Sequence, residues 1–315
     1  MTGPVLALDI GGTKLAAGII DTGGRVVASA RIATPEGLDG EGLWSTVASL
    51  SRQLVQGPGN GAISGVGIGC GGPMQWPDGR VSPLNIPSWT EFPLRDRVRE
   101  LFPDVPVRLH NDAVAFVAGE HWRGAGRGRD HVLGMVVSTG VGGGLVLGGR
   151  LVDGASGNAG HIGHVVVDAD GPDCICGGRG CLEAIARGPA VASWAVSQGW
   201  RPGSATTATA RDLTDDAARG HPVAQAALAR AGHALGVAIA GATHLLDLEV
   251  VTVGGGLSQA GPLLFDPLEE AFRRHARMQF ARDVRVVPAA LGQEAGLVGA
   301  AALVLAGDDR YWSAD

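Results

Sequence analysis

The sequence predicts an α/β fold, in which strands and helices alternate along the chain. Apolar runs of strand length recur throughout and end in glycine-rich turns, as at residues 5–10 (VLALDI), which precede GGTK. Stretches with apolar residues at helical spacing lie between these runs. Only 4% of the 315 residues are aromatic and 52 are glycines, so we expect a core of Val, Leu, Ile and Ala. Such alternation is typical of α/β architectures.

The elements can be assigned in chain order. The opening runs, joined by GGTK, predict a β-hairpin. It is followed by a strand at 24–32, a helix at 39–56, a strand entering a glycine loop at 64–73, a helix at 93–101, a strand at 105–112 and a helix at 113–122. Residues 131–152 repeat the layout of the opening hairpin, which indicates a weak internal repeat. The rest predicts helices within 190–244, strands at 248–258 and 283–291, and helices at 262–276 and 295–305.

Composition and charge exclude several classes of protein. The net charge of −6 provides no basic surface for nucleic acid or for an anionic membrane. The first residues, MTGPVLALDIGGTK, lack the positive region and long apolar stretch of a signal peptide. No apolar run reaches roughly 18 residues, so we expect no membrane span. We therefore expect a cytoplasmic protein without nucleic-acid or membrane partners.

Three glycine turns follow predicted strands: DIGGTK at 9–14, STGVGGG at 138–144 and VGGGLS at 253–258. The backbone N–H groups of such turns can bind phosphate oxygens. None of the turns matches the P-loop pattern, and each taken alone could be an ordinary hairpin turn. Asp9, at the end of a buried strand, favours a nearby cation, and Mg²⁺ prefers oxygen ligands. Together these features predict a site for a nucleoside triphosphate.

The sequence HNDA places Asn111 and Asp112 between a predicted strand and a predicted helix. Both residue types are favoured as helix N-caps, which is one interpretation. The other makes Asp112 a general base, with Asn111 orienting a polar substrate.

Three of the four cysteines lie in CICGGRGC, at positions 174, 176 and 181. A disulfide between Cys174 and Cys176 would be strained, and structural disulfides are rare in the cytoplasm. AGHIGH, just upstream, contains His161 and His164. One histidine with three cysteines is a standard ligand set for structural zinc, and inert thiols are the alternative. The isolated Cys70 is expected to be a small buried residue.

The segments LALDIGGTK, HNDA, STGVGGG, AGHIGH and CICGGRGCLEA occur in this order. The chain thereby resembles the ROK family (repressors, open reading frames and sugar kinases) from Leu6 to the closing GLVGAAAL. The resemblance implies an actin-like, ribonuclease-H-type ATPase fold with two domains and a central cleft. It assigns residues 1–120 and a C-terminal helix at about 296–315 to a smaller α/β domain. It assigns residues 121–295 to a larger α/β domain with a zinc loop.

The resemblance also implies roles for individual residues in an ATP-dependent sugar kinase. This enzyme would transfer the γ-phosphate of MgATP to the 6-hydroxyl of a hexose, and Asp112 matches its catalytic base. The implied nucleotide-binding residues are Asp9, Gly11, Gly12, Thr13, Lys14, Thr139, Gly140, Gly254, Gly255 and Gly256. The implied sugar-binding residues are Gly71, Gly72, Asn111, Asp112, His161, His164 and Glu183. The implied ligands of a structural Zn²⁺ are His164, Cys174, Cys176 and Cys181.

The sequence departs from the family pattern at three positions. His161 replaces the usual glutamate of ExGH, and an imidazole cannot bind two hydroxyl groups as a carboxylate can. Gly71 stands where proline is common, and STG at 138–140 replaces the usual GTG. The first two changes fall at the sugar end of the expected cleft. Glucose is slightly favoured as the substrate, with N-acetylglucosamine or N-acetylmannosamine as the alternative.

Other functions remain open from sequence alone. The repressors of this family carry a DNA-reading domain before the first glycine hairpin, and here the hairpin begins within ten residues of Met1. A catalytically silent sugar sensor and an actin-like ATPase with a non-sugar substrate are the remaining alternatives. The resemblance suggests a homodimer or a tetramer.

Overall fold

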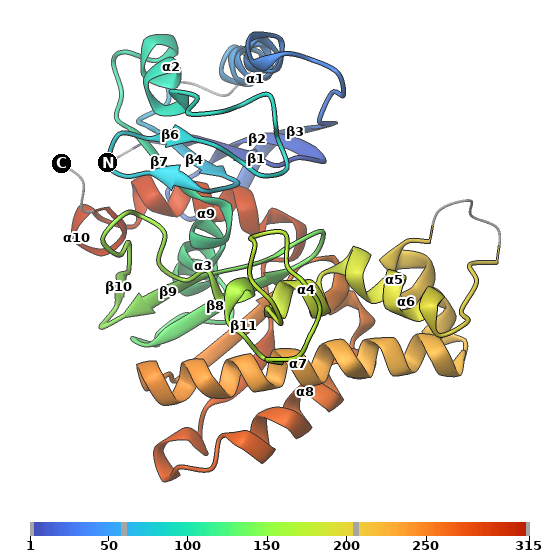
Figure 1. The fold of residues 1–315 in the computed structure, drawn as a ribbon. Coiled ribbons are helices and arrows are strands. Elements are labelled where there is room, and N and C mark those ends of the chain that lie inside the picture. The colour runs from blue at the N-terminus through green and yellow to red at the C-terminus, as the bar shows by residue number, and fades with distance from the viewer. Residues whose placement is uncertain (1–2, 58–61, 204–207, 313–315) are drawn as a thin grey trace. The chain divides into compact units, whose positions relative to one another are not determined.

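The computed structural model describes residues 3–57, 62–203 and 208–312, and it confirms the α/β assignment (Figure 1). The chain divides into two compact units. The first contains Met1–Asp130, Gly144–Gly160 and Ala290–Asp315, and the second contains His131–Gly143 and His161–Ala289. These limits differ from the predicted domain limits, chiefly because 144–160 packs with the N-terminal part of the chain. The predicted domains and cleft stay predictions.

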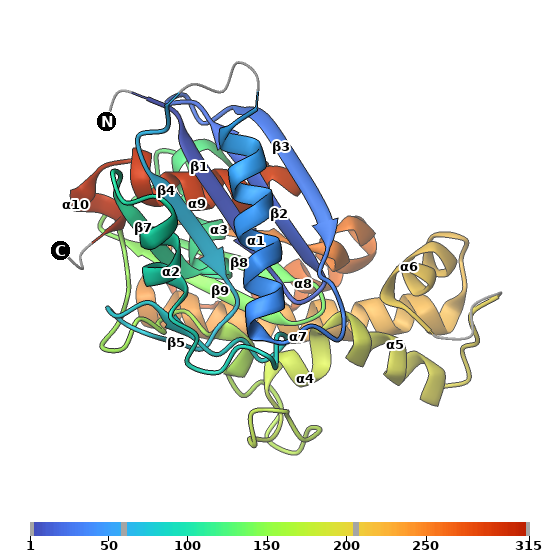
Figure 2. The same ribbon diagram turned by 90° about the horizontal axis from the view of Figure 1, so that it is seen from above.

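The first unit is built on a five-stranded sheet with the order β3-β2-β1-β4-β7. Its strands are β1 (Val5–Ile10), β2 (Lys14–Ile20), β3 (Val26–Ala33), β4 (Val66–Cys70) and β7 (Val107–Asn111). Strand β2 is antiparallel to its neighbours β1 and β3, whereas β4 and β7 run parallel to β1. Helices α1 (Gly40–Val55) and α2 (Leu94–Leu101) cover one face, and α3 (Asp112–Arg123) and α9 (Ala295–Leu305) cover the other (Figures 1 and 2).

A second sheet has the order β10-β9-β8-β11-β12. Its strands are β8 (Val132–Val137), β9 (Val141–Leu147), β10 (Arg150–Leu151), β11 (Val250–Gly254) and β12 (Arg285–Pro288). As in the first sheet, three strands consecutive in the chain are followed by two later ones; β10 is antiparallel to β9, and β11 is parallel to β8 and β12. This shared order supports the internal repeat proposed from the two glycine hairpins. The boundary between the units falls within β9.

The strand register places the segments that carry the predicted site residues next to one another. Ile10, Cys70 and Asn111 lie side by side at the carboxyl ends of β1, β4 and β7. The turns that follow these strands therefore share one edge of the first sheet. In the second sheet Gly254 lies beside Val136, so the turns after β8 and β11 also meet at one edge.

Small residues allow the helices of the first unit to approach closely. A Cβ atom added at Gly299 of α9 would lie 2.0 Å from the carbonyl oxygen of Ala115 on α3. One added at Gly119 of α3 would lie 2.9 Å from the backbone nitrogen of Gly299. This contact is closed to any larger side chain, which explains the glycines inside two helices. The chain continues from α9 into α10 (Asp308–Tyr311).

The remaining elements are short or belong to the second unit. Strands β5 (Met74–Gln75) and β6 (Arg80–Val81) form a small hairpin in the first unit, and η4 (Gly292–Glu294) precedes α9. The helices of the second unit are η1 (Ile162–His164), α4 (Leu182–Ala186), α5 (Gly188–Ser197), α6 (Ala210–Ala218), α7 (Pro222–Leu246), η2 (Gly256–Ala260), α8 (Pro262–His275) and η3 (Gln279–Ala281).

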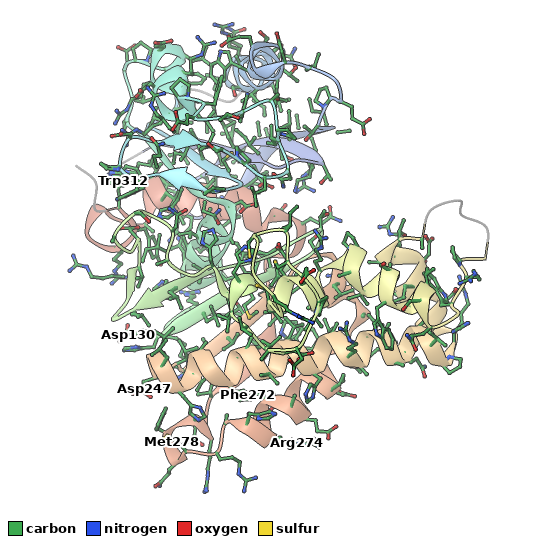
Figure 3. The ribbon with its side chains drawn as sticks, in the orientation of Figure 1. Asp130, Asp247, Phe272, Arg274, Met278 and Trp312 are labelled. Atoms are coloured by element: carbon green, nitrogen blue, oxygen red, sulfur yellow. The ribbon has the colours of Figure 1, made fainter. Side chains whose placement is uncertain are left out.

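Helix α7 corrects the prediction that no apolar segment of this chain is long enough to span a membrane. By length and composition it could cross a membrane, although its apolar run is interrupted by polar residues. Its most apolar window is 61% buried, which is what a core helix shows. It packs along α8, where Cβ atoms added at Gly232 and Gly236 would lie 2.5 Å and 2.4 Å from carbonyl oxygens of α8. Phe272 of α8 is buried, whereas Met278, just beyond this helix, is exposed (Figure 3).

Candidate active site and metal centre

Asp112 begins α3 directly after β7 and lies near two further charged groups of the first unit. Asp9, at the end of β1, forms an ion pair with Lys14, with 2.9 Å between Nζ and Oδ2. Burial raises the pKa of Asp112 to about 6, and the negative charge of Asp9 adds to this effect. Hydrogen bonds from the backbone and the charge of Lys14 partly oppose the rise in pKa. A carboxylate with a pKa close to neutrality can accept a proton from a hydroxyl group.

Asn111 combines the two roles that the sequence left open. Its Oδ1 accepts a hydrogen bond from the N–H of Ala113 at 2.9 Å, so the residue caps α3. Its Nδ2 faces Gly72, where an added Cβ would lie only 2.8 Å away. The amide oxygen of Asn111 therefore caps the helix, and its amide nitrogen lies toward the loop that contains Gly71 and Gly72. These two glycines were both predicted to contact sugar.

The first glycine turn is closed by its own backbone. The N–H of Gly11 donates to the carbonyl oxygen of Lys14 at 2.9 Å, and the hydroxyl of Thr34 donates to the carbonyl oxygen of Gly11. Thr13, in the turn, has an exposed side chain. Asn85 packs against this turn, because a Cβ at Gly12 would lie 2.3 Å from its carbonyl oxygen.

Asn85 is a site residue that the sequence analysis missed. Its Oδ1 lies 3.2 Å from the position of a Cβ at Gly71, so its side chain lies between the two predicted glycine sites. The preceding stretch carries no pattern that would have singled it out. Only the fold brings residue 85 to this edge of the sheet.

Gly296, in the first turn of α9, is a second residue that sequence analysis did not assign to the site. A Cβ at this position would lie 2.5 Å from Oδ2 of Asp9. We expect Gly296→Ala to displace the Asp9 carboxylate and to lower kcat at least about tenfold, because small misplacements in an active site are costly. The measurement is kcat in the MgATP-dependent sugar phosphorylation that the family resemblance implies, on protein shown by circular dichroism to be folded.

Gly241→Ala is the matched control, because it is also a helical glycine and nothing lies within 4 Å of its added Cβ. Alanine favours a helix over glycine, so this variant should keep wild-type kcat and an equal or higher Tm. A folded Gly296→Ala protein with wild-type kcat would show that the position of Asp9 is not critical.

The second glycine turn joins β8 to β9 in the second unit. The N–H of Ser138 donates to the carbonyl oxygen of Gly140 at 2.8 Å, and Thr139 is exposed. Glu183, in the first turn of α4, accepts a hydrogen bond from the N–H of Val141 at 2.8 Å. The same carboxylate would lie 2.8 Å from a Cβ at Gly140. Glu183 was predicted to contact sugar, and in the structure it also supports this turn.

The third glycine turn, at 254–256, lies beside the second. Gly255 has φ of +93°, and a Cβ there would lie 2.4 Å from the carbonyl oxygen of Val137. Only glycine suits this position, both for its backbone conformation and for the close contact. A Cβ at Gly256 would lie 3.6 Å from the hydroxyl oxygen of Ser138, so the two turns lie next to each other at one edge of the second sheet.

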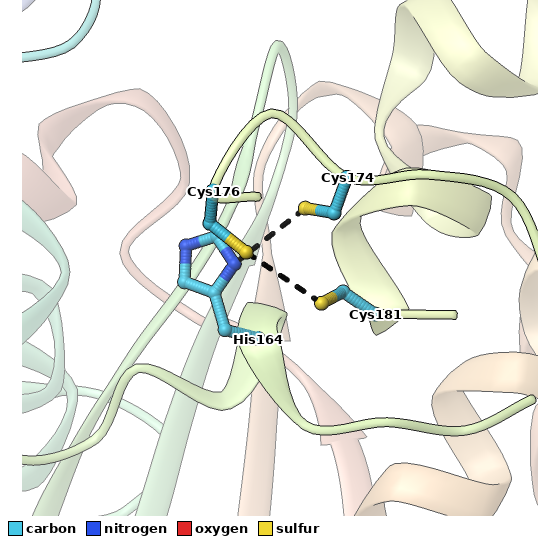
Figure 4. Close-up of side chains that lie close together, drawn as sticks. All are labelled: His164, Cys174, Cys176 and Cys181. Atoms are coloured by element: carbon cyan, nitrogen blue, oxygen red, sulfur yellow. Dashed lines mark hydrogen bonds between the residues drawn. The ribbon is translucent and has the colours of Figure 1, made fainter. Parts of the chain in front are cut away.

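His164 and the three predicted cysteine ligands form one cluster in the second unit (Figure 4). Their four ligand atoms all lie within 4.8 Å of one another. Nδ1 of His164 lies 3.8 Å from Sγ of Cys174, and Sγ of Cys176 lies 3.8 Å from Sγ of Cys181. Ligand atoms of a tetrahedral zinc with bonds of about 2.3 Å lie at similar separations. The residues present therefore fit Zn²⁺.

The chemistry of the cluster agrees with this fit. Burial, together with the neighbouring thiols, raises the pKa of Cys181 to about 12. A cation is the partner that allows several close thiols to ionise together. His164 points Nδ1 at the cluster, and the ring of His161 stacks at 6.2 Å from its ring. Four protein ligands would give the metal a structural role.

The predicted site residues thus form two groups. In the first unit, Asp112, Asn111 and the glycines at 71 and 72 share a sheet edge with Asp9 and the turn at 11–14. In the second unit, His161, His164 and Glu183 lie on the segments that pack at the start of β9, and the turns at 139–140 and 254–256 share a sheet edge. A Cβ at Gly163 would lie 2.0 Å from the carbonyl oxygen of Val141, which shows how closely this histidine segment packs on β9.

Comparison with known proteins then decides the family. The model of the ROK family matches residues 5–306, which is nearly the whole chain. The chain belongs to the ROK family. Within it, the chain is 35% identical over 312 residues to a glucokinase from Thermotoga maritima, covering 95% of this chain and 96% of that protein. It is also 35% identical over 300 residues to an N-acetylmannosamine kinase from Yersinia pseudotuberculosis, covering 95% and 97%.

Solved structures of ROK proteins have the same fold. A crystal structure of a ROK glucokinase from Streptomyces griseus, in complex with glucose and AMPPNP, is 34% identical in sequence with a TM-score of 0.84. The match covers 97% of this chain and 100% of that one. The implied ribonuclease-H-type, actin-like fold is therefore confirmed for this ROK chain.

Proposed function

We propose that this ROK protein is an ATP-dependent sugar kinase that phosphorylates the 6-hydroxyl of a hexose. The observation that carries the proposal is Asp112, half-buried with a raised pKa, at the sheet edge that also presents Asp9, Lys14 and a glycine turn. The glucokinase and N-acetylmannosamine kinase relatives support a hexose or an N-acetylhexosamine as the acceptor. The AMPPNP complex of the Streptomyces griseus protein supports ATP as the donor.

In the proposed reaction, Asp112 accepts the proton of the sugar hydroxyl while that oxygen attacks the γ-phosphorus. The bond from the γ-phosphorus to the bridging oxygen breaks, and ADP leaves. The backbone N–H groups of the glycine turns at 11–14 and at 139–140 are the proposed phosphate-binding groups, and Asp9 would help to hold Mg²⁺, which would supply charge neutralisation. Most of the rate enhancement in such transfers comes from positioning and from charge neutralisation.

Zinc supplies structure in this proposal. His164, Cys174, Cys176 and Cys181 would hold the ion, and their coordination would order the loop that carries them and fix the ring of His164 through Nδ1. The other ring nitrogen would then be available for a sugar hydroxyl, so that His164 would link the metal site to the substrate.

His161 is the residue we expect to influence the choice of sugar. A coupled ADP-release assay with MgATP should be run with glucose, mannose, N-acetylglucosamine, N-acetylmannosamine, fructose and allose. Transfer to one of these sugars is expected, with glucose slightly favoured. Because a carboxylate can accept bonds from two hydroxyls, we expect His161→Glu to change the ratio of kcat/KM between sugars at least about tenfold.

Two outcomes would contradict these statements. Sugar binding by calorimetry without turnover on any hexose would favour a catalytically silent sensor over a kinase. Unchanged kcat/KM ratios in His161→Glu would show that His161 does not select the sugar.

The proposal extends to assembly and location. The side chains of Leu245, Met278 and Phe280 are exposed near the end of α7, with His244 against Phe280. Exposed large apolar groups that lie together are typical of protein interfaces, which supports a homodimer or a tetramer. The enzyme would act in the cytoplasm, where MgATP is available.

A further inference from the structure

His110 is a buried residue that none of the steps above uses. It is the last residue but one of β7 and directly precedes Asn111 and Asp112. Its side chain has no exposed surface, and its Nε2 lies 3.0 Å from Oδ1 of Asp153, whose side chain is 14% exposed. Asp153 comes from the segment after β10, which belongs to the same compact unit. The fold thus joins two residues 43 positions apart.

The hydrogen bonds define which nitrogen carries the proton. The backbone N–H of Asn111 donates to Nδ1 of His110 at 2.8 Å, so Nδ1 is the acceptor and carries no proton. In a neutral imidazole the proton is then on Nε2, which donates to the carboxylate of Asp153. Both ring nitrogens of His110 therefore have partners, one in the main chain of the site and one in a separate segment.

The segment that carries Asp153 is itself held in place. The side chain of Asn158 donates to the carbonyl oxygen of Met74 at 3.1 Å, and a Cβ at Gly157 would lie 2.4 Å from Cβ of Trp76. The ring of Trp76 lies 5.0 Å from the ring of His110 and 5.0 Å from that of Trp312, which is labelled in Figure 3. The imidazole is thus fixed by packing as well as by hydrogen bonds.

From these contacts we infer that His110 and Asp153 form a positioning pair for the proposed phosphate transfer. The pair fixes the peptide N–H of Asn111, and Asn111 in turn caps α3 at the point where Asp112 begins. Neither member touches a reacting atom in this account. The pair acts by orienting the base. This inference rests on the proposed kinase function.

The test compares Asp153→Ala with Asp153→Asn. Alanine removes the acceptor of the Nε2 proton, and we expect kcat to fall about 30-fold, since misplacing a catalytic group by a fraction of an ångström is costly. Asparagine keeps an acceptor oxygen and should restore kcat to within about threefold of wild type, because Nε2–H can still donate. KM for ATP should change little in both variants. Asp78→Ala, at an exposed aspartate on a neighbouring loop, should leave kcat unchanged.

A second measurement does not depend on turnover. In ¹⁵N NMR spectra of the wild-type protein, His110 should appear as the single neutral form with the proton on Nε2, and Asp153→Ala should populate other forms. A His110 protonated on Nδ1 would overturn the inference, as would an Asp153→Ala protein that keeps wild-type kcat even if its Tm falls. The inference would also be overturned if Asp153→Asn lowered kcat as much as Asp153→Ala does. A wild-type protein that phosphorylates no hexose would refute the proposed function instead, and the spectra would still test the pair.

Discussion

Asp112→Asn is expected to lower kcat by about three orders of magnitude or more while leaving the binding of sugar and MgATP nearly unchanged. The amide has almost the shape of the carboxylate, but it cannot accept the proton of the attacking hydroxyl. General-base catalysis contributes roughly 10²–10⁴-fold, and the loss should appear in kcat rather than in affinity. The measurement is steady-state kinetics together with calorimetric titration of the sugar and of a non-hydrolysable ATP analogue.

The same residue predicts a pH profile. Asp112 works as a base only when ionised, and its pKa is raised to about 6 by burial and by the charge of Asp9. We therefore expect kcat to be constant above this pH and to fall about tenfold for each pH unit below it. An ordinary exposed carboxylate would place this fall near pH 4.

Asp78→Asn serves as the control, because Asp78 is an exposed aspartate on a loop of the same unit. It should have wild-type kcat at every pH. If Asp112→Asn keeps turnover near that of wild type, Asp112 is only the first residue of α3, and another group accepts the proton.

Loss of one of the proposed zinc ligands is expected to abolish sugar phosphorylation by disordering the segment proposed to bind sugar. Cys181 is buried, begins α4 as its N-cap, and precedes Glu183 by two residues. Without the metal, Cys181→Ser should contain less than about a tenth of an equivalent of zinc and should lose more than about 100-fold in kcat/KM for the sugar. Metal analysis, calorimetry with the sugar and the ADP-release assay measure the three parts of this prediction.

Cys70→Ala is the control for metal content. Cys70 is a buried free cysteine at the end of β4, in the other compact unit, and it should not affect zinc stoichiometry. Full activity in metal-free wild-type protein would show that the cluster at His164 does not need zinc for the reaction.

The glycine turns, the cysteine cluster and the cap of α3 could be predicted from the sequence. The glycine turns after β1, β8 and β11 follow from apolar runs of strand length, and the cysteine spacing at 174–181 predicts the cluster of candidate metal ligands that the structure shows. Asn111 also caps α3 as its residue type suggests. Each of these features depends on residues close together in the chain.

The features that sequence analysis missed depend on contacts between distant segments. Asn85 reaches the first glycine turn, Gly296 lies against Asp9, and Asp153 accepts from His110 only because the sheet and its helices bring these segments together. Helix α7 shows the opposite case, since its hydropathy resembles that of a membrane span and only its burial against other helices identifies it as part of a core. Sequence periodicity carries no information about such pairings.

The most direct measurement is a ³¹P NMR spectrum of the protein incubated with MgATP and the sugar that it turns over. The account predicts ADP and, in equal amount, a phosphomonoester coupled to the two protons on C6 of the hexose. The Asp112→Asn protein should form neither at an appreciable rate. Release of inorganic phosphate without a sugar phosphate, or a phosphate on another hydroxyl, would contradict the assignment of this chain as a hexose 6-kinase.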